Sequence, residues 1–81
     1  MKYKATVMFK KTGESETKWS MSSIGAAATW ARKIIRDNIR TEEPPYNSRV
    51  EVSIIEEDEI RLVFLKSGTE KAMYDMLWQL T

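Results

Sequence analysis

The chain has 81 residues and a net charge of +1, with 42% hydrophobic and 31% charged residues and neither cysteine nor histidine. These values are typical of one small globular domain over residues 1–81 and argue against disorder and a disulfide framework. Without cysteine and histidine, the chain lacks thiolate chemistry, the commonest general base and the commonest metal ligand.

Residues 2–21 have the alternating pattern of a β-hairpin. Apolar side chains occupy every second position from Tyr3 to Phe9, and mostly basic or polar side chains lie between them. Polar turn residues follow at positions 12–15, and Thr17, Trp19 and Met21 then alternate again. The pattern predicts two strands, with Trp19 on the face that packs into the core.

Residues 24–40 have the spacing of an amphipathic helix. Ser22 and Ser23 can supply an N-cap hydroxyl, and apolar side chains then recur at intervals of three and four residues up to Ile39. The paired prolines within residues 42–48 must end this helix, because proline lacks a backbone N–H and forces extended backbone on the preceding residue.

Apolar residues alternate again on either side of the acidic turn at residues 56–59. They occupy every second position over residues 50–54, and the same alternation over residues 60–64 predicts that Ile60, Leu62 and Phe64 face the core. Residues 50–64 therefore form a second predicted hairpin.

A short helix is predicted at the end of the chain. Ser67 and Glu70 fit a capping box, with Ser67 as the N-cap and Glu70 reaching back. Apolar residues from Ala72 to Leu80 then have helical spacing.

The predicted order is ββαββα, which is an α+β class with a two-layer architecture and a four-stranded sheet. The hairpin–helix–hairpin of residues 2–66 resembles the β-grasp arrangement of small immunoglobulin-binding domains, with an added C-terminal helix. The resemblance involves no binding motif, so it implies no function. An alternative is two ββα units related by a pseudo-twofold axis, with both helices on one face of the sheet.

Neither catalytic nor membrane-spanning segments are apparent. The three glycines are isolated at positions 13, 25 and 68, so no phosphate-binding loop is present, and no nucleophile has an obvious base. The N-terminus enters the strand pattern without an apolar signal segment, and no stretch approaches membrane-spanning length. We therefore expect a cytoplasmic protein that is not an enzyme and has no cofactor, metal or small-molecule substrate.

The charge divides the chain into two halves. Residues 1–40 hold nine Lys/Arg against three acids, a net of +6, and residues 41–81 hold four against nine, a net of −5. In the basic half, Arg32, Arg36 and Arg40 have the i, i+4, i+8 spacing of a row along one side of a helix, next to Lys33. This row either binds phosphates or an acidic protein, or is the ordinary solvated face of the helix.

Lysines also follow the outer face of the first strand, at Lys2, Lys4 and Lys10. These lysines and the arginine row are the candidates for nucleic-acid binding, although the pattern assigns the aromatic residues of the strands to the core side. The same outer face carries apolar residues, for which we expect the C-terminal helix or a second subunit as cover: Met8, Ile55, Val63 and Leu65.

Three aromatic residues lie outside the helical core stripes. Trp30 flanks the stripe of the first helix, and Tyr74 and Trp78 lie four residues apart on the second. Such side chains are frequent at binding hot spots, although a flanking Trp also often seals a small core. We expect them to be anchors of a protein-interaction module, with the Arg32, Arg36 and Arg40 row steering an acidic partner.

Three function classes follow from these candidates. The first is a non-enzymatic regulator, inhibitor or assembly subunit that binds another protein, a type common among phage and mobile-element accessory proteins. The second is a nucleic-acid-binding protein, and the third is a structural subunit that forms homo-oligomers, for example a homodimer.

Overall fold

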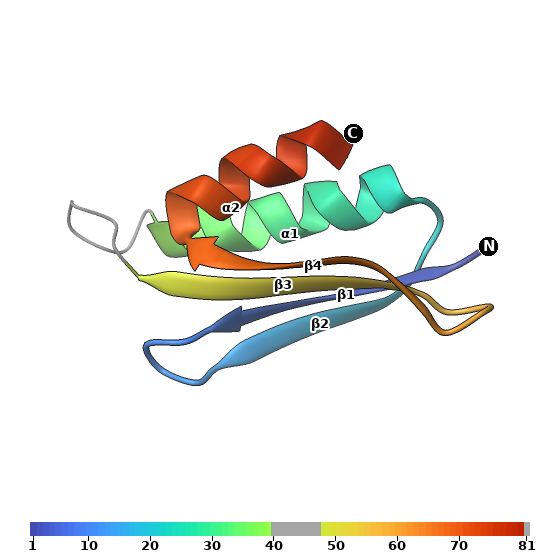
Figure 1. Ribbon diagram of the computed structural model, residues 1–81, viewed down its shortest axis with the longest axis horizontal. Helices are drawn as coiled ribbons and strands as arrows, with labels where there is room; N and C mark the ends of the chain where they lie inside the picture. The colour runs from blue at the N-terminus through green and yellow to red at the C-terminus, as the bar shows by residue number, and fades with distance from the viewer. Residues whose placement is uncertain (40–47, 81) are drawn as a thin grey trace.

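Four strands and two α-helices follow one another in the computed structural model, which describes residues 1–39 and 48–80 (Figure 1). In chain order they are β1 Tyr3–Phe9, β2 Ser15–Met21, α1 Ile24–Ile39, β3 Arg49–Glu56, β4 Arg61–Thr69 and α2 Glu70–Leu77, and α2 continues into a 3-10 turn, η1, at Trp78–Leu80. The predicted α+β class and ββαββα order are confirmed.

The sheet is antiparallel throughout, with the strand order β2-β1-β3-β4. The first strands of the two hairpins, β1 and β3, are adjacent in the middle, and α1 and α2 lie side by side on one face (Figure 1). This is the topology of two ββα units about a pseudo-twofold axis, the second of the two arrangements that the sequence pattern leaves open, rather than the β-grasp-like one.

The core lies between the sheet and the helices. Val7 of β1 and Val52 of β3 are paired neighbours and fully buried, and Ile35 of α1 is buried against this layer. Ala28 and Ala31 are also fully buried, and their short side chains allow α1 to approach the sheet closely.

An irregularity in β2 reverses the predicted direction of Trp19. The register shifts by one residue between the pairs Tyr3–Met21 and Ala5–Lys18, and Ser20 has a φ of +58°. Such a β-bulge changes the alternation of side chains. Met21 is therefore buried as predicted, but Trp19 is 61% exposed and lies on the opposite face, where Lys4 covers its ring.

A second bulge changes the faces of β4. Ile54 pairs with Phe64, but Ile55 pairs with Leu62, so β4 has one additional residue, Val63. Leu62 consequently lies on the face opposite the helices and is 51% exposed, and Val63 packs against the core cluster. The predictions for Leu62 and Val63 are thus both wrong. Ile60, also predicted in the core, lies in the turn and is 85% exposed.

The two helices begin differently from each other. The Ser23 hydroxyl accepts a hydrogen bond from the Ala26 amide at 3.0 Å, as the sequence predicted for α1. The predicted capping box with Ser67 as the N-cap is wrong, because β4 continues to Thr69. Thr69 is the N-cap of α2 and accepts from the Ala72 amide at 3.2 Å. Glu70 is buried and accepts from the Asn38 side chain at 2.8 Å.

The predicted end of the first helix at the paired prolines, together with Arg40, lies outside the described residues.

Candidate interaction surfaces

The face of the sheet opposite the helices is the largest candidate surface. The residues of β1 and β3 that face the helices are buried, so alternation directs the side chains between them to this other face. No helix within residues 1–39 and 48–80 lies on it (Figure 1), which excludes α2 as the predicted cover. We call it the open face, and define it by residues in register across β2, β1, β3 and β4: Trp19, Lys4, Ile55, Leu62; Thr17, Thr6, Ser53, Leu65; Ser15, Met8, Glu51, Ser67.

Exposed apolar side chains lie at both margins of the open face. Trp19 is on the β2 margin, and Leu62 and Leu65 on the β4 margin are 51% and 50% exposed. Ile55 pairs with Leu62 and extends the apolar area toward the centre of the sheet. Met8, Ile55 and Leu65 were predicted on this face, but Trp19 and Leu62 were not, because their positions depend on the bulges in β2 and β4.

Polar side chains of opposite charge occupy the two central strands. Lys4 of β1 lies with its ammonium group 4.2 Å from the centre of the Trp19 ring. Glu51 of β3 pairs with Met8 of β1. Between these rows, the hydroxyls of Thr6 and Thr17 share a hydrogen bond of 3.0 Å. On β3 the exposed Arg49 alternates with the buried Val50 and so shares this face with Glu51, which leaves β1 basic and gives β3 charges of both signs.

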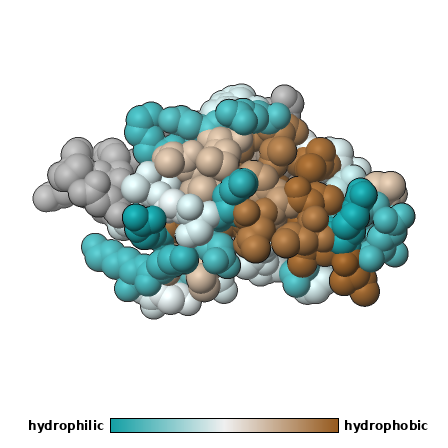
Figure 2. All heavy atoms as spheres, viewed as in Figure 1, coloured by the Kyte–Doolittle hydropathy of each residue, from teal (hydrophilic) through white to brown (hydrophobic). Residues whose placement is uncertain are grey.

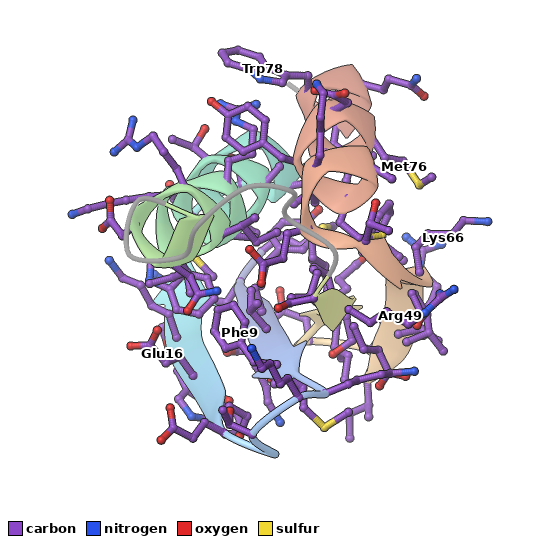
Figure 3. All side chains as sticks on the ribbon, turned by 90° about the vertical axis from the view of Figure 1, so that its left-hand side faces the viewer. Phe9, Glu16, Arg49, Lys66, Met76 and Trp78 are labelled. Atoms are coloured by element: carbon purple, nitrogen blue, oxygen red, sulfur yellow. The ribbon has the colours of Figure 1, made fainter. Side chains whose placement is uncertain are left out.

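The helix layer carries a second, smaller surface around Trp78. The Arg32 guanidinium lies 3.6 Å from the centre of the Trp78 ring, and Tyr74 meets that ring edge-on with centroids 6.3 Å apart. Figure 3 shows Trp78 at the end of α2 that is far from the sheet. Trp30 is two residues from Arg32, about 200° around α1, so it does not join this cluster.

The predicted arginine row is not a continuous exposed surface. Arg32 is only 8% exposed, because it packs on Trp78 and donates a hydrogen bond to the Thr29 hydroxyl at 3.2 Å. The expectation that it faces solvent is therefore wrong. Arg36 is exposed, with its Nε 3.7 Å from Asp37, and Lys33 is exposed beside it. Arg40 is outside the described residues.

A shallow hollow of about 490 Å³ lies along the free edge of β4, where it meets α2. Its lining includes Phe64, Met76 and Leu80, with Lys66 and Asp75 among the polar residues. Figure 3 shows Lys66 and Met76 on this side, and in Figure 2 apolar side chains gather on the right-hand half of the view, near the C-terminal end and the β3–β4 turn. The sequence pattern did not predict this hollow, because its residues come from separate elements.

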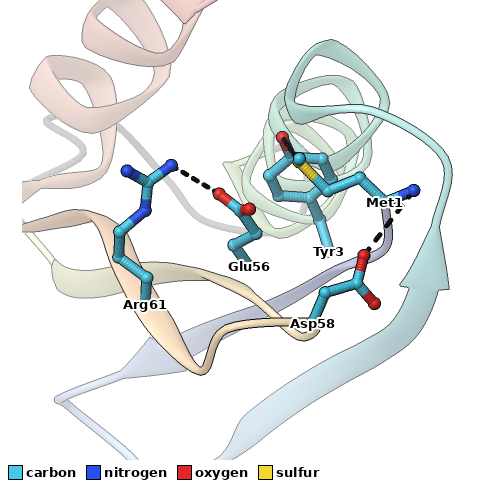
Figure 4. Close-up of polar contacts among 5 residues, drawn as sticks. All are labelled: Met1, Tyr3, Glu56, Asp58 and Arg61. Carbon is cyan, nitrogen blue, oxygen red and sulfur yellow. Dashed lines mark hydrogen bonds and ion pairs between the residues drawn. The ribbon is translucent and has the colours of Figure 1, made fainter.

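The β3–β4 turn is held to the sheet by a buried carboxylate (Figure 4). Glu56 is 1% exposed, and its Oε2 lies 2.6 Å from Nη2 of Arg61. This hydrogen bond and the charge of Glu56 raise the pKa of the Arg61 guanidinium, so Arg61 stays charged. On the other side of the turn, Asp58 lies 3.6 Å from the N-terminal amine of Met1.

Few direct contacts neutralise the opposite charges of the two halves. Within the part of the chain that the structure describes, the Met1–Asp58 contact is the one ion pair between the basic and acidic halves. Arg36–Asp37, Arg61–Glu56 and Lys71–Asp75 each lie within one half. The charges of β1 and β3 therefore remain at the surface.

No metal-binding cluster, membrane-spanning helix or similar protein points to a further site among the described residues. The described residues contain no group of three or more Asp or Glu side chains arranged to hold a metal ion, and no helix among them is long and apolar enough to cross a membrane. No protein-family model matches the chain, and no significantly similar protein was found among curated proteins or solved structures.

Proposed function

We propose that the protein is a small non-enzymatic protein-interaction module that binds a protein partner through its open face. The exposure of Trp19, Leu62 and Leu65 on that one face carries the proposal. Grouped exposed apolar side chains are typical of interfaces, and Trp is enriched among residues that dominate binding. A regulator, inhibitor or assembly subunit would act through such a face; a cytoplasmic location and a phage or mobile-element origin stay predictions from the sequence.

The aromatic cluster of the helix layer supports binding less strongly. Trp78 is 52% exposed, but Arg32 covers one side of its ring and Tyr74 contacts that ring edge-on. Part of the surface of Trp78 is therefore already buried by contacts within the chain. Trp30 is partly buried against the core. We therefore retain these residues as a secondary surface.

Leu62→Lys and Trp78→Lys form a matched test of the proposed surface. Both residues are about half exposed, but they lie on opposite layers of the molecule. Leu62→Lys should weaken partner binding by roughly 30-fold, the effect of losing a hot-spot residue, and leave the fold intact. Trp78→Lys should leave binding nearly unchanged. Affinity measured by calorimetry, with circular dichroism as the folding control, would reject the proposal if only Trp78→Lys weakened binding.

Binding of single-stranded nucleic acid is the second candidate, and one observation favours it. The β2 bulge brings Trp19 beside Lys4 on the open face, which combines a stacking ring with a cation. If the protein binds nucleic acid, its affinity for labelled oligonucleotides, measured by fluorescence anisotropy, should fall steeply as the salt concentration rises. Trp19→Ala should also weaken that binding. Flat titrations at low salt would exclude it.

A further inference from the structure

We infer that the partner on the open face is a second copy of this chain, packed sheet against sheet about a twofold axis parallel to the strands. This inference rests on the proposed function and names both the occupant and its orientation. The dimer would have four layers, with two sheets inside and a pair of helices on each outer side.

Each strand of the open face has its own chemical character. Lys4 lies on β1, and the alternation continues to Lys2 and Lys10 beyond its two ends. Glu51 and Arg49 lie on β3, which therefore carries charges of both signs on this face. Trp19 is on the β2 margin, and the exposed leucines are on the β4 margin.

A twofold axis between β1 and β3, parallel to them, brings the apolar margins of the two copies together. It places β1 of each copy opposite β3 of the other, and β2 opposite β4. Trp19 then faces Leu62 of the second copy, because both belong to one row of the face, and Lys4 faces Ile55 for the same reason. Both contacts occur twice, as twofold symmetry requires.

The alternative twofold axis, which runs across the strands, gives a poorer match. It would lay each strand over its own counterpart in the reverse direction, so Trp19 would lie over Ser15 and Leu62 over Ser67 of the second copy. The exposed apolar side chains would then face serines instead of each other. The apolar pattern of the open face therefore selects the axis parallel to the strands.

Among the described residues, the centre of the open face is not closed by ion pairs of its own. Within residues 1–39 and 48–80, none of Lys2, Lys4, Lys10 and Glu51 forms an ion pair. The middle of the face carries the short side chains of Thr17, Thr6 and Ser53, and two of these hydroxyls already bond to each other. These short side chains lie in the row that faces its own copy, so they allow the two sheets to approach until the larger margins meet.

The open face is large enough for a dimer. Four strands about 4.8 Å apart, each about seven residues long at about 3.3 Å per residue, cover roughly 440 Å² in projection. Two such faces cover roughly 900 Å² before the relief of the side chains is counted. Biological interfaces generally exceed about 1,000 Å² in total, so the whole face, with its side chains, is of the required size.

Single cysteines at Ser15 and Ser67 test the orientation, because the chain has no cysteine of its own. Ser15 on β2 and Ser67 on β4 belong to the same row of the face, at opposite margins. The proposed axis brings Ser15 of one copy opposite Ser67 of the other and keeps the two Ser15 side chains about 14 Å apart along the sheet. Ser→Cys is nearly isosteric, so both variants should fold.

The experiment compares Ser15→Cys alone, Ser67→Cys alone and their equimolar mixture, each treated with a short bismaleimide crosslinker. We expect the mixture to give at least fivefold more covalent dimer than either variant alone, and Leu62→Lys in both chains to abolish the excess. Equal yields in the three samples would overturn the inference. So would a wild-type chain that stays monomeric while Leu62→Lys abolishes binding to a different protein, which would leave the proposed function standing.

Discussion

At the residue level, one charged side chain has a structural role that a hydrophobic pattern does not reveal. Arg32 is a charged residue by type, yet it is nearly buried, because its flat guanidinium stacks on the Trp78 ring. The stack joins α1 to the end of α2. It should therefore contribute to stability rather than to electrostatic steering.

Trp78→Ala tests this role of the stack. A cation–π contact that is partly desolvated contributes about 1–2 kcal/mol, so we expect the free energy of unfolding to fall by about that amount, with the chain still folded. Trp19→Ala is the control, because its partner Lys4 is less buried than Arg32; its effect should be about 0.5 kcal/mol. Urea unfolding measures both values, and a smaller loss for Trp78→Ala than for Trp19→Ala would contradict the assignment.

Arg61 should stabilise the β3–β4 hairpin through the carboxylate that it neutralises. Removing Arg61 leaves Glu56 buried without its cation, whereas Arg49, at the other end of β3, is exposed and outside the ion pairs of the described residues. Arg61→Ala should thus lower the urea midpoint clearly, and Arg49→Ala should not. Because the pKa of Arg61 is raised, its contribution is lost only when strong alkali removes the proton. Equal midpoints for the two variants would show that Glu56 does not depend on Arg61.

At the level of elements, the two bulges determine which side chains are available for binding. Ser20, in the β2 bulge, and Ile60, in the turn before β4, both have positive φ, at +58° and +50°, although neither is glycine or asparagine. Left-handed backbone costs such residues roughly 1–2 kcal/mol, so the surrounding structure must hold them there. The bulge at Ser20 turns Trp19 to the open face, and the extra residue in β4 does the same for Leu62.

Substitution of Ile60 should relieve this strain at little cost. The side chain is 85% exposed, so its removal loses little packing. Ile60→Asn and Ile60→Gly should each raise the free energy of unfolding by about 1 kcal/mol, as measured by urea titration. Leu62→Gly, two residues later in extended backbone, should lower it instead. A loss of stability in both Ile60 variants would mean that the positive φ at this turn is not strained.

The elements themselves could be predicted from the sequence, but their pairing and irregularities could not. Alternation and helical spacing carry enough information to find four strands and two helices, and the N-cap of α1 at Ser23 could also be predicted. A bulge needs no special residue, so nothing at Ser20 signalled that Trp19 changes face. The pattern also does not say which strand edges meet, so it did not decide the pairing of β1 with β3. The candidate site was therefore only half predicted: the lysines, Met8, Ile55 and Leu65 were placed on this face, and Trp19 and Leu62 were not.

At the level of the whole molecule, the two ββα units place exposed apolar side chains at opposite margins of one face. The first unit brings Trp19 on β2, and the second brings Leu62 and Leu65 on β4. An axis parallel to the strands brings each margin opposite the other margin of a second copy, so the face is complementary to its own twofold copy.

A double-mutant comparison tests that complementarity directly. Trp19→Ala and Leu62→Ala should each weaken self-association roughly tenfold, because each variant removes one side of both Trp19–Leu62 contacts between the copies. The double variant should be little weaker than either single variant, since the two side chains contact each other. Dissociation constants from fluorescence dilution would contradict the model if the two losses simply added.

Sedimentation equilibrium of the wild-type chain across a wide concentration range tests the central claim most directly. The open-face dimer predicts a mass that rises to twice the 9.4 kDa of the chain, that returns to 9.4 kDa in Leu62→Lys, and that is unchanged by Trp78→Lys. A wild-type mass of 9.4 kDa at every concentration, or dissociation by Trp78→Lys but not by Leu62→Lys, would contradict it.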